Sequence, residues 1–390
     1  MRVLHIINNL GLGGAETLLY RMSVRDRSNE HVVVSIGAPE WYSNRLQKKG
    51  VELHHLDMES PLAVPRGIAR LNRIIRESGA DVVQCWMYRS NLLGGFLAQA
   101  AGKPVVWGIH CSSLEPLRPS SKMLAYISGI VAGWNPDYIV NCSTKSEQLH
   151  AKLGFTSGRG GVIHNGYDPD AFFPDEKIRQ KMRKALGVGR DTFLIGTIAR
   201  WHAQKDIPNL LRAARIAHDK GVPLTCLLIG AGLGPDNAAL AEAIDTLGCK
   251  DFAVPIGPRP DIDDVARALD LHVLASCGAE AFPNAVAESM LSGTPNAVTD
   301  IGDSALMVGK SGWVSPPKDP ETLAAAIVEA WKEKIERPSD WEKRRKAARA
   351  QIADNFTLDR MAAAYEAVWR DVIAAKSKSP RAKSSIAKSL

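Results

Sequence analysis

Short apolar runs alternate with amphipathic segments along almost the whole chain. The apolar runs are nearly continuous in Val and Ile, which is typical of strands buried on both faces of a sheet. They lie at 2–8, 31–37, 81–86, 103–110, 137–143 and 160–166 and, after a break, at 192–200, 224–230, 252–257 and 271–276. Between them, apolar positions recur at helical spacing, for example over 16–25, 66–78 and 146–153. This alternation predicts an α/β protein with parallel, doubly wound sheets.

The break in the pattern, "YDPDAFFPDEK" from Tyr167, predicts the domain organisation. A chain of 390 residues suits two domains. We expect a Rossmann-like domain at 1–168 and a second one at 169–355, the two facing a cleft. Residues 356–375 read as a helix that packs back on the first domain, and 376–390 as a basic, disordered tail.

Composition narrows the class of protein. No apolar run is long enough to span a bilayer, and the first residues read as a strand rather than as a secretory signal. The six cysteines are scattered without metal spacing, which favours reduced thiols in a cytoplasmic protein. The net charge of +7 lies mostly in the tail, whose five cations leave about +2 for the rest. No recognition-helix or RNA-binding signature indicates a nucleic-acid partner.

The segment 66–78 places four arginines on one side of its predicted helix, opposite an apolar side. The arginines are Arg66, Arg70, Arg73 and Arg76, and the apolar residues are Ile68, Leu71, Ile74 and Ile75. One interpretation is an ordinary solvated face. The other is that this face, with the basic tail, holds the protein on the inner, anionic face of the cytoplasmic membrane.

Ligands of open parallel sheets bind at the carboxyl ends of the strands, where this chain places several candidates. Gly13 and Gly14 open the first helix, whose free amides attract anions, although plain turn chemistry also explains them. "GLGGAE" and "GAGLGP" carry Glu16 and Pro235 where a dinucleotide fingerprint has its third glycine. A nicotinamide cofactor is therefore disfavoured.

Two cations after one later strand indicate a diphosphate site that needs no metal. Arg200 ends one strand and Lys205 follows five residues later, so the two could grip a diphosphate directly. Asp261-Ile262-Asp263 mimics a metal-binding D-x-D, but it stands at a helix start, where capping explains it better. We expect no metal and no other cofactor.

The stretch "CGAEAFPNAVAESMLSGTPNAVTDIG" resembles the E-x7-E region of the retaining family 4 glycosyltransferases with the GT-B fold. The resemblance extends over nearly the whole chain and favours the type that acts in bacterial surface-polysaccharide assembly. It includes "GLGGAE", "DYIVNCSTKS", "HNGYDPDAFFP", "ARWHAQKD", "LLIGAGLGP" and "GWVSPPKDPETLAAAI", in the family's order. One departure is Ala281, where many relatives have glycine.

The resemblance implies roles for individual residues. Glu280 would face the donor sugar and its leaving diphosphate, Glu288 would accept hydrogen bonds from the ribose, and His110 would approach the sugar near the reacting carbon. A histidine at a strand end can also be merely hydrogen-bonded in place. The catalytic candidates are His110, Arg200, Lys205 and Glu280, and the donor-binding candidates are Gly13, Gly14, Gly230, Gly232, Phe282, Pro283, Asn284, Ala285 and Glu288.

These implications predict a retaining transferase of cell-envelope biosynthesis. It would move a sugar from a nucleotide diphosphate sugar, UDP rather than GDP, to a hydroxyl of a glycan or polyprenyl-linked acceptor. No side chain stands out as a covalent nucleophile, which fits a front-face route. Two alternatives remain: a nucleotide-sugar epimerase of GT-B type, and a catalytically idle partner subunit.

Overall fold

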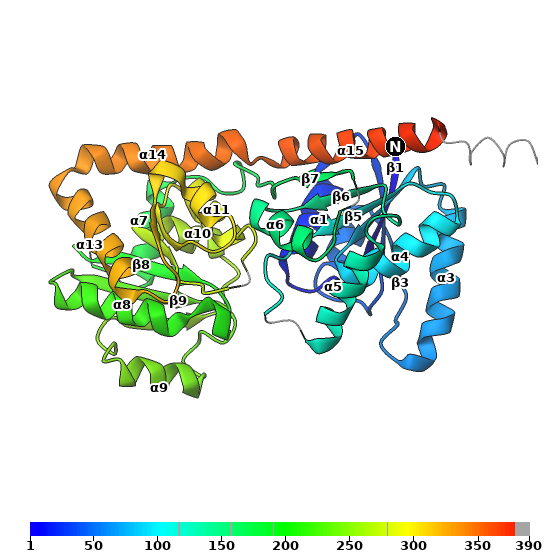
Figure 1. Ribbon diagram of the computed structural model, residues 1–390. Coiled ribbons are helices and arrows are strands. Elements are labelled where there is room, and N and C mark those ends of the chain that lie inside the picture. Colours follow the sequence, from blue (N-terminus) through cyan, green and yellow to red (C-terminus); the bar gives the residue numbers. More distant parts are fainter. Residues whose placement is uncertain (116–117, 157, 190, 279, 379–390) are drawn as a thin grey trace, which may run out of the picture. The chain divides into compact units, whose positions relative to one another are not determined.

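The computed structural model describes residues 1–115, 118–156, 158–189, 191–278 and 280–378. The chain forms two compact units (Figure 1). Unit 1 comprises Met1–Gly166 together with the segment from Leu358 onward, and unit 2 comprises Tyr167–Thr357. Each unit is a parallel sheet with helices on its faces, so the predicted pair of Rossmann-like, doubly wound domains is confirmed.

Unit 1 is built on a seven-stranded sheet in the order β3-β2-β1-β4-β5-β6-β7, with every pairing parallel. The strands are β1 (Arg2–Ile7), β2 (Glu30–Ser35), β3 (Glu52–His55), β4 (Val82–Trp86), β5 (Val105–Ile109), β6 (Tyr138–Asn141) and β7 (Gly160–Val162). The strand order reverses between β1 and β4. Ligands of such sheets bind at the carboxyl ends of the strands on either side of this switch point.

The helices of unit 1 cover both faces of this sheet (Figure 1). They are α1 (Gly14–Arg25), α2 (Ser43–Lys48), the 3-10 turn η1 (Pro61–Ala63), α3 (Val64–Glu77), α4 (Tyr88–Ala100), α5 (Pro119–Val131), α6 (Thr144–Lys152) and α15 (Leu358–Lys378). α3 has the predicted faces, because Arg66, Arg70, Arg73 and Arg76 are exposed while Leu71 and Ile75 are buried.

The last helix, α15, packs on the sheet of unit 1. Tyr365 and Trp369 are fully buried there, in one core cluster with Trp86 of β4. Trp369 also donates a hydrogen bond from Nε1 to Gln84 Oε1 over 3.1 Å. The helix continues to Lys378, so the first residues assigned to the basic tail are helical, and the rest of that tail lies outside the described residues.

Unit 2 is built on a six-stranded parallel sheet in the order β10-β9-β8-β11-β12-β13. The strands are β8 (Phe193–Ile198), β9 (Leu224–Ile229), β10 (Ala253–Gly257), β11 (Leu271–Leu274), β12 (Asn296–Thr299) and β13 (Trp313–Ser315). The strand order reverses between β8 and β11. Arg200 follows β8 and Glu280 follows β11, so the sequence candidates of this unit flank its switch point.

The helices of unit 2 are α7 (Glu176–Ala185), η2 (Ala203–Lys205), α8 (Ile207–Asp219), α9 (Ala238–Thr246), α10 (Ile262–Ala268), α11 (Asn284–Leu291), α12 (Ser304–Val308), η3 (Gly309–Ser311), α13 (Pro320–Glu336) and α14 (Pro338–Asn355). None of the helices in the described part of either unit has both the length and the hydropathy needed to cross a membrane.

Candidate active site

Lys205 and Glu280 form an ion pair at the switch point of unit 2. Lys205 ends η2, and the segment around it docks on the loop after β11, where Cys277 donates from its backbone N to Gln204 O over 2.8 Å. Glu280 is 5% exposed, and its Oε1 also accepts a hydrogen bond from Ser276 Oγ at 2.7 Å. A buried carboxylate needs such polar partners, and here Lys205 and Ser276 hold the Glu280 side chain in one position.

Arg200 lies beside the glycine-rich turn after β9. The turn is tied to the Arg200 segment by a hydrogen bond from Trp201 N to Ala231 O at 2.7 Å. A Cβ on Gly230 would overlap the carbonyl oxygen of Ala199, and one on Gly232 would press on Trp201. These glycines allow two backbone segments to touch. They therefore position Arg200, which is exposed and has no ion-pair partner among the described residues.

The start of α11 presents free backbone amides. The helix begins at Asn284, with Pro283 at the N-cap position rather than in the first turn, and no side chain of the described chain caps it. Phe282 is buried against Phe356 with ring centroids 5.1 Å apart, and Tyr167 donates from its hydroxyl to Asn284 Oδ1 at 3.0 Å. Uncapped amides at a helix start bind phosphate or hydroxyl oxygens.

Glu288 lies one turn further along α11. It is half-buried, and its spacing of four residues from Asn284 puts both side chains on one face of the helix. Ala285 belongs to the first turn of the same helix. A half-buried carboxylate close to an uncapped helix start can accept hydrogen bonds from a vicinal diol while the amides hold an anion.

Gly302 is a site residue that the sequence reasoning missed. It has a left-handed backbone (φ +58°), and a Cβ there would overlap the carbonyl oxygens of Glu280 and Ala281. The adjacent Asp303 donates from its backbone N to Ala281 O at 2.9 Å. Gly302 thus fixes the backbone that carries Glu280, as Ser276 fixes its side chain. The glycine in "TDIG" was the available signal, since it closes the E-x7-E stretch.

His110 follows β5 in unit 1. Its ring stacks on Trp86 with centroids 5.0 Å apart, and both ring nitrogens are buried without a hydrogen-bond partner among the described residues. Burial lowers the pKa of His110 to about 4. The imidazole is therefore neutral near pH 7, with one donor and one acceptor unused, which is unlike a histidine held in place by its own hydrogen bonds.

Gly13 and Gly14 stand where the first helix of unit 1 begins. Gly13 is the N-cap of α1, with an extended backbone, and Gly14 has open space around its Cα. The carboxylate of Glu16 folds back over Gly13, and burial raises its pKa, with Glu40 nearby adding to the rise. An anion arriving at this helix start would compete with that carboxylate, so donor binding here stays a prediction.

The Asp261-Ile262-Asp263 segment carries neither a metal cluster nor the predicted cap. Asp261 occupies the N-cap position of α10, but its carboxylate pairs with Arg259 at 2.6 Å instead of accepting from the helix. Asp263 pairs with Arg267 at 2.9 Å. The expectation of side-chain capping is wrong, because a nearby guanidinium binds the carboxylate more strongly. No cluster of three metal-ligating side chains occurs among the described residues.

Comparison with known proteins supports the predicted fold and class of protein. Residues 12–171 match Glycosyltransferase Family 4, and residues 192–333 match Glycosyl transferases group 1. D-inositol 3-phosphate glycosyltransferase 1 of Catenulispora acidiphila is 27% identical over 71% of this chain and 72% of its own length. The putative glycosyltransferase EpsF of Bacillus subtilis is 25% identical over 77% of this chain and 79% of its own length.

A further relative is the UDP-Gal:alpha-D-GlcNAc-diphosphoundecaprenol alpha-1,3-galactosyltransferase of Escherichia coli, 24% identical over 69% of this chain and 71% of its own. Among solved structures, Anabaena HepE in complex with UDP superposes with a TM-score of 0.84 at 20% identity, covering 95% of this chain and 100% of that one. Fold and sequence together define a glycosyltransferase of the GT-B fold. The chain therefore carries a glycosyltransferase family 4 domain followed by a glycosyl transferases group 1 domain, and it is a glycosyltransferase.

Proposed function

We propose that this glycosyltransferase moves a sugar from a nucleotide diphosphate sugar, with UDP as the nucleotide, to an acceptor hydroxyl with retention of anomeric configuration. The observation that carries the proposal is the Lys205–Glu280 pair beside the unpaired Arg200 and the uncapped start of α11. It supplies cations and amides for a diphosphate, and a carboxylate that cannot move.

The choice of UDP rests on relatives. HepE was solved with UDP and with UDP-glucose, and the Escherichia coli relative uses a UDP-sugar according to its name. In this assignment, Glu288 accepts hydrogen bonds from the ribose hydroxyls. Gly230 and Gly232 allow the close approach of the backbone beside Arg200. This proposed mode of nucleotide binding requires no metal ion.

The reaction breaks the bond between the anomeric carbon and the diphosphate oxygen, and the electron pair leaves with the diphosphate. Arg200, Lys205 and the amides of α11 stabilise this growing charge, and fixed groups of this kind are each worth about 3 kcal/mol. The acceptor oxygen bonds to the same face of the anomeric carbon, and its proton passes to the leaving phosphate oxygen. Retention follows without a covalent enzyme intermediate.

His110 belongs to unit 1, and its neutral imidazole suits a polar but uncharged role. It can donate to a sugar hydroxyl or accept from one, and it adds no charge next to an anomeric carbon that becomes positive in the transition state. The test of this role is the position of the acid limb in the pH dependence of turnover, which should lie well below that of a histidine with an ordinary pKa.

For the acceptor, we propose a glycan or a lipid-linked glycan of the cell envelope, reached at the inner face of the cytoplasmic membrane. The name of the Escherichia coli relative specifies a diphosphoundecaprenol acceptor. The exposed arginines of α3 supply charge for an anionic surface. Sedimentation with vesicles containing phosphatidylglycerol should show binding that weakens as salt is raised, and binding unaffected by salt would contradict this electrostatic contribution.

The function is tested by thermal shift against UDP, GDP and ADP, each with and without EDTA. We expect UDP to raise the melting temperature whether or not EDTA is present, and Glu288→Gln to abolish most of the shift. Glu329→Gln on the exposed side of α13 is the matched control and should leave it unchanged. A shift with GDP alone would overturn the choice of UDP, and no shift with any nucleotide would favour an idle subunit. If NMR shows that the sugar of the donor is converted to its epimer with no acceptor present, the protein is an epimerase.

A further inference from the structure

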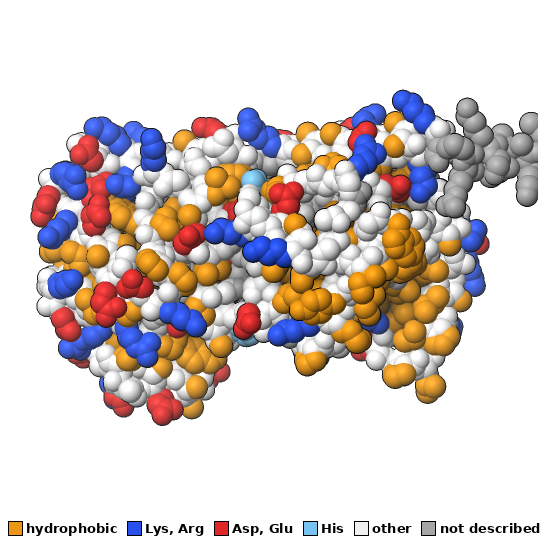
Figure 2. Space-filling model, in the orientation of Figure 1, with side chains coloured by type: hydrophobic (Ala, Val, Ile, Leu, Met, Phe, Trp, Pro, Cys, Tyr) orange, Lys and Arg blue, Asp and Glu red, His pale blue; other side chains and the backbone are white. Residues whose placement is uncertain are grey.

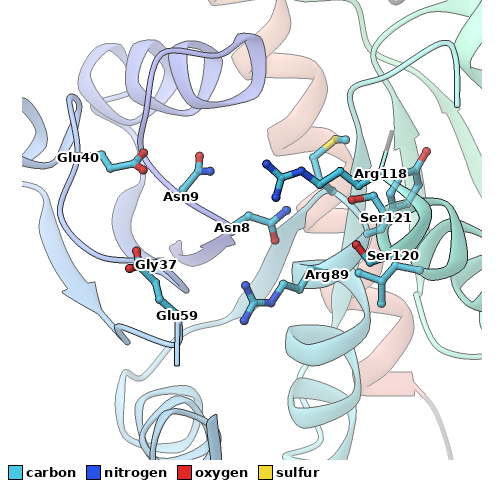
Figure 3. Close-up of a pocket in the computed structure, with 12 residues that line it drawn as sticks. Asn8, Asn9, Gly37, Glu40, Glu59, Arg89, Arg118, Ser120 and Ser121 are labelled. Carbon is cyan, nitrogen blue, oxygen red and sulfur yellow. The ribbon is translucent and has the colours of Figure 1, made fainter. Parts of the chain in front are cut away.

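A polar pocket lies at the switch point of unit 1 (Figure 3). Its volume is about 670 Å³. Asn8 and Asn9 reach it from the end of β1, and the Met87–Arg89 segment reaches it from the end of β4. These are the two strands between which the order of the sheet reverses, the place where open sheets bind ligands. The volume is enough for a sugar and a diphosphate.

The backbone at the rim of this pocket is strained. Met87 has a left-handed conformation (φ +70°), which an unbranched apolar side chain rarely adopts. Ser90 Oγ holds the next turn by donating to Asn8 Oδ1 at 2.7 Å, so the ends of β1 and β4 are tied together. Backbone strain that is held in place by surrounding bonds clusters at functional sites.

The pocket has an arginine side and an acid side. Arg89 and Arg118 project into it from one side, and Glu40 and Glu59 face them across Asn8 and Asn9 (Figure 3). Neither arginine has a carboxylate within ion-pair distance in the described part of the chain. Arg89 is instead anchored by donating from Nη2 to Met58 O at 3.1 Å. Two uncompensated guanidinium groups side by side suit a diphosphate, whereas carboxylates and amides suit sugar hydroxyls.

An apolar groove of about 400 Å³ continues from the arginine side. Arg89 and Leu124 line both cavities, so the groove begins where the polar pocket ends. Apart from Arg89 its lining is entirely apolar, comprising Met58, Val64, Ile68, Leu92, Leu93, Phe96, Leu97 and Leu124 from α3, α4 and α5 and the segments beside them. Along this surface, therefore, carboxylates and amides come first, then arginines, then hydrocarbon.

The bulky side chains of α5 face outward beside the groove. Its buried face is made of Ala125, Ser128 and Gly129, while Tyr126 is 55% exposed and Ile130 78%. Figure 2 shows hydrophobic side chains gathered over this part of unit 1. An exposed apolar face at helical spacing (Met123, Tyr126, Ile127 and Ile130) marks a contact with another molecule or with lipid.

We infer that this surface is the acceptor site and that its ligand is a glycosyl diphospho-lipid. The sugar lies against Asn8, Asn9 and the two carboxylates, the diphosphate lies between Arg89 and Arg118, and the hydrocarbon chain follows the apolar groove. The order of chemistry in the ligand is the order of chemistry along the surface. The outward face of α5 contacts the bilayer from which the chain of the ligand emerges. The inference rests on the proposed function and names the acceptor class.

The binding test uses farnesyl diphosphate as the probe, with inorganic diphosphate and farnesol as its two halves. Calorimetry on the full chain, with saturating UDP present to fill the donor site, should show farnesyl diphosphate binding at least about tenfold more tightly than inorganic diphosphate. Affinity should also rise from dimethylallyl to geranyl to farnesyl diphosphate, because each longer chain buries more of the groove.

Two surface substitutions test the two parts of the site. Arg118→Gln should weaken farnesyl diphosphate binding about tenfold, because a charge-assisted phosphate contact is lost. Phe96→Gln should weaken it about threefold or more and leave inorganic diphosphate unaffected. Arg73→Gln on α3 and Ile335→Gln on α13 change exposed residues outside both cavities and should bind like the unaltered chain.

The outcomes separate this inference from the proposed function. If UDP stabilises the protein but farnesyl diphosphate binds no better than inorganic diphosphate, the lipid site is overturned and the transferase assignment stands. If the two surface substitutions behave like their controls, the site is likewise overturned. Prenyl diphosphate binding without a UDP shift would support the site and overturn the proposed donor chemistry.

Discussion

The two candidate sites of this protein are built in different ways. In unit 2 the charges are fixed by backbone packed on backbone, with Gly302 against the Glu280 loop and Gly230 against the Arg200 segment. In unit 1, Arg89 lies on α4 and Arg118 directly precedes α5, and an open apolar groove adjoins the pocket that they line. The first arrangement gives one rigid geometry. The second tolerates ligands of different length and shape.

The difference fits the roles proposed for the two sites. A transition-state charge is stabilised only by groups that need not reorganise, so the diphosphate side requires rigid support. An acceptor has to be recognised, and exposed side chains can be exchanged without disturbing the sheet beneath them. Substitutions in unit 2 should therefore reduce the rate for every acceptor, and those in unit 1 should change which acceptor is used.

The largest effect is expected from Lys205→Ala. It removes a cation from the site and breaks the ion pair of the buried Glu280, so turnover should fall about 100-fold or more. Turnover is measured with UDP-glucose and a prenyl diphosphate-linked sugar, and melting temperature is recorded in parallel. Lys220→Ala, at the exposed end of α8, is the control. A turnover within threefold of the control would remove Lys205 from the mechanism.

Gly302→Ala should have the next largest effect. The added methyl group overlaps the backbone of Glu280, so we expect about 1–3 kcal/mol lower stability and weaker UDP binding. Gly221→Ala is a close control, because Gly221 also has a left-handed backbone (φ +88°) but open space around it. Urea unfolding gives the loss of stability of each variant. The loss in Gly221→Ala measures backbone strain alone, and the additional loss in Gly302→Ala measures the steric overlap. Equal losses would show that Gly302 does not position the Glu280 loop.

The same contrast explains what the sequence could predict. The sequence predicts strands of both sheets where apolar residues are nearly continuous, as in β1 and β9. Three strands, β3, β12 and β13, are not predicted, because "ELHH", "NAVT" and "WVS" are short and only partly apolar. Lys205 and Glu280 are candidates from the sequence because they stand in short local motifs, "ARWHAQKD" and the E-x7-E segment, and the structure brings them together as an ion pair.

The pocket of unit 1 could not be predicted in that way. Asn8, Arg89 and Arg118 lie far apart along the chain and follow no local spacing, and they meet only because the sheet reverses its order between β1 and β4. The outward face of α5 was missed as well, since a helix with bulky apolar residues on one side normally buries that side. Only the packed structure shows that its small residues face inward.

The two units also differ in their buried histidines. In unit 1, Trp86 donates from Nε1 to His5 Nδ1 at 3.2 Å, His5 Nε2 meets His31 Nδ1 at 2.9 Å, and His31 Nε2 meets Asp26 at 3.2 Å. Because tryptophan can only donate, this chain of bonds fixes both histidines as neutral tautomers. Burial lowers the pKa of each, and it lowers the pKa of His150 to about 4, as for His110. In unit 2, burial lowers the pKa of His272 in the same way.

Acid should therefore unfold unit 1 before unit 2. A histidine whose pKa is lower in the folded state than its unfolded value of about 6.5 binds its proton only on unfolding, so stability falls as the pH drops from about 6.5 towards 4. The full slope is about 1.4 kcal/mol per pH unit for each such histidine. Unit 1 has four and unit 2 has one among the described residues. Amide hydrogen exchange at pH 7 and pH 5, corrected for the intrinsic rate, should show β1 losing more protection than β8.

His110→Gln sharpens this comparison with the smallest expected change. The substitution removes one of the four titrating groups of unit 1, so the acid-induced loss of stability in that unit should shrink by about a quarter. Unit 2 should be unaffected, because its histidine is untouched. If the slope of unit 1 stays the same, His110 is protonated alike in the folded and unfolded states, and its imidazole is then charged in the folded protein at acid pH. The uncharged role proposed for His110 beside the sugar would then hold only above about pH 6.5, while the diphosphate binding proposed for unit 2 would be unaffected.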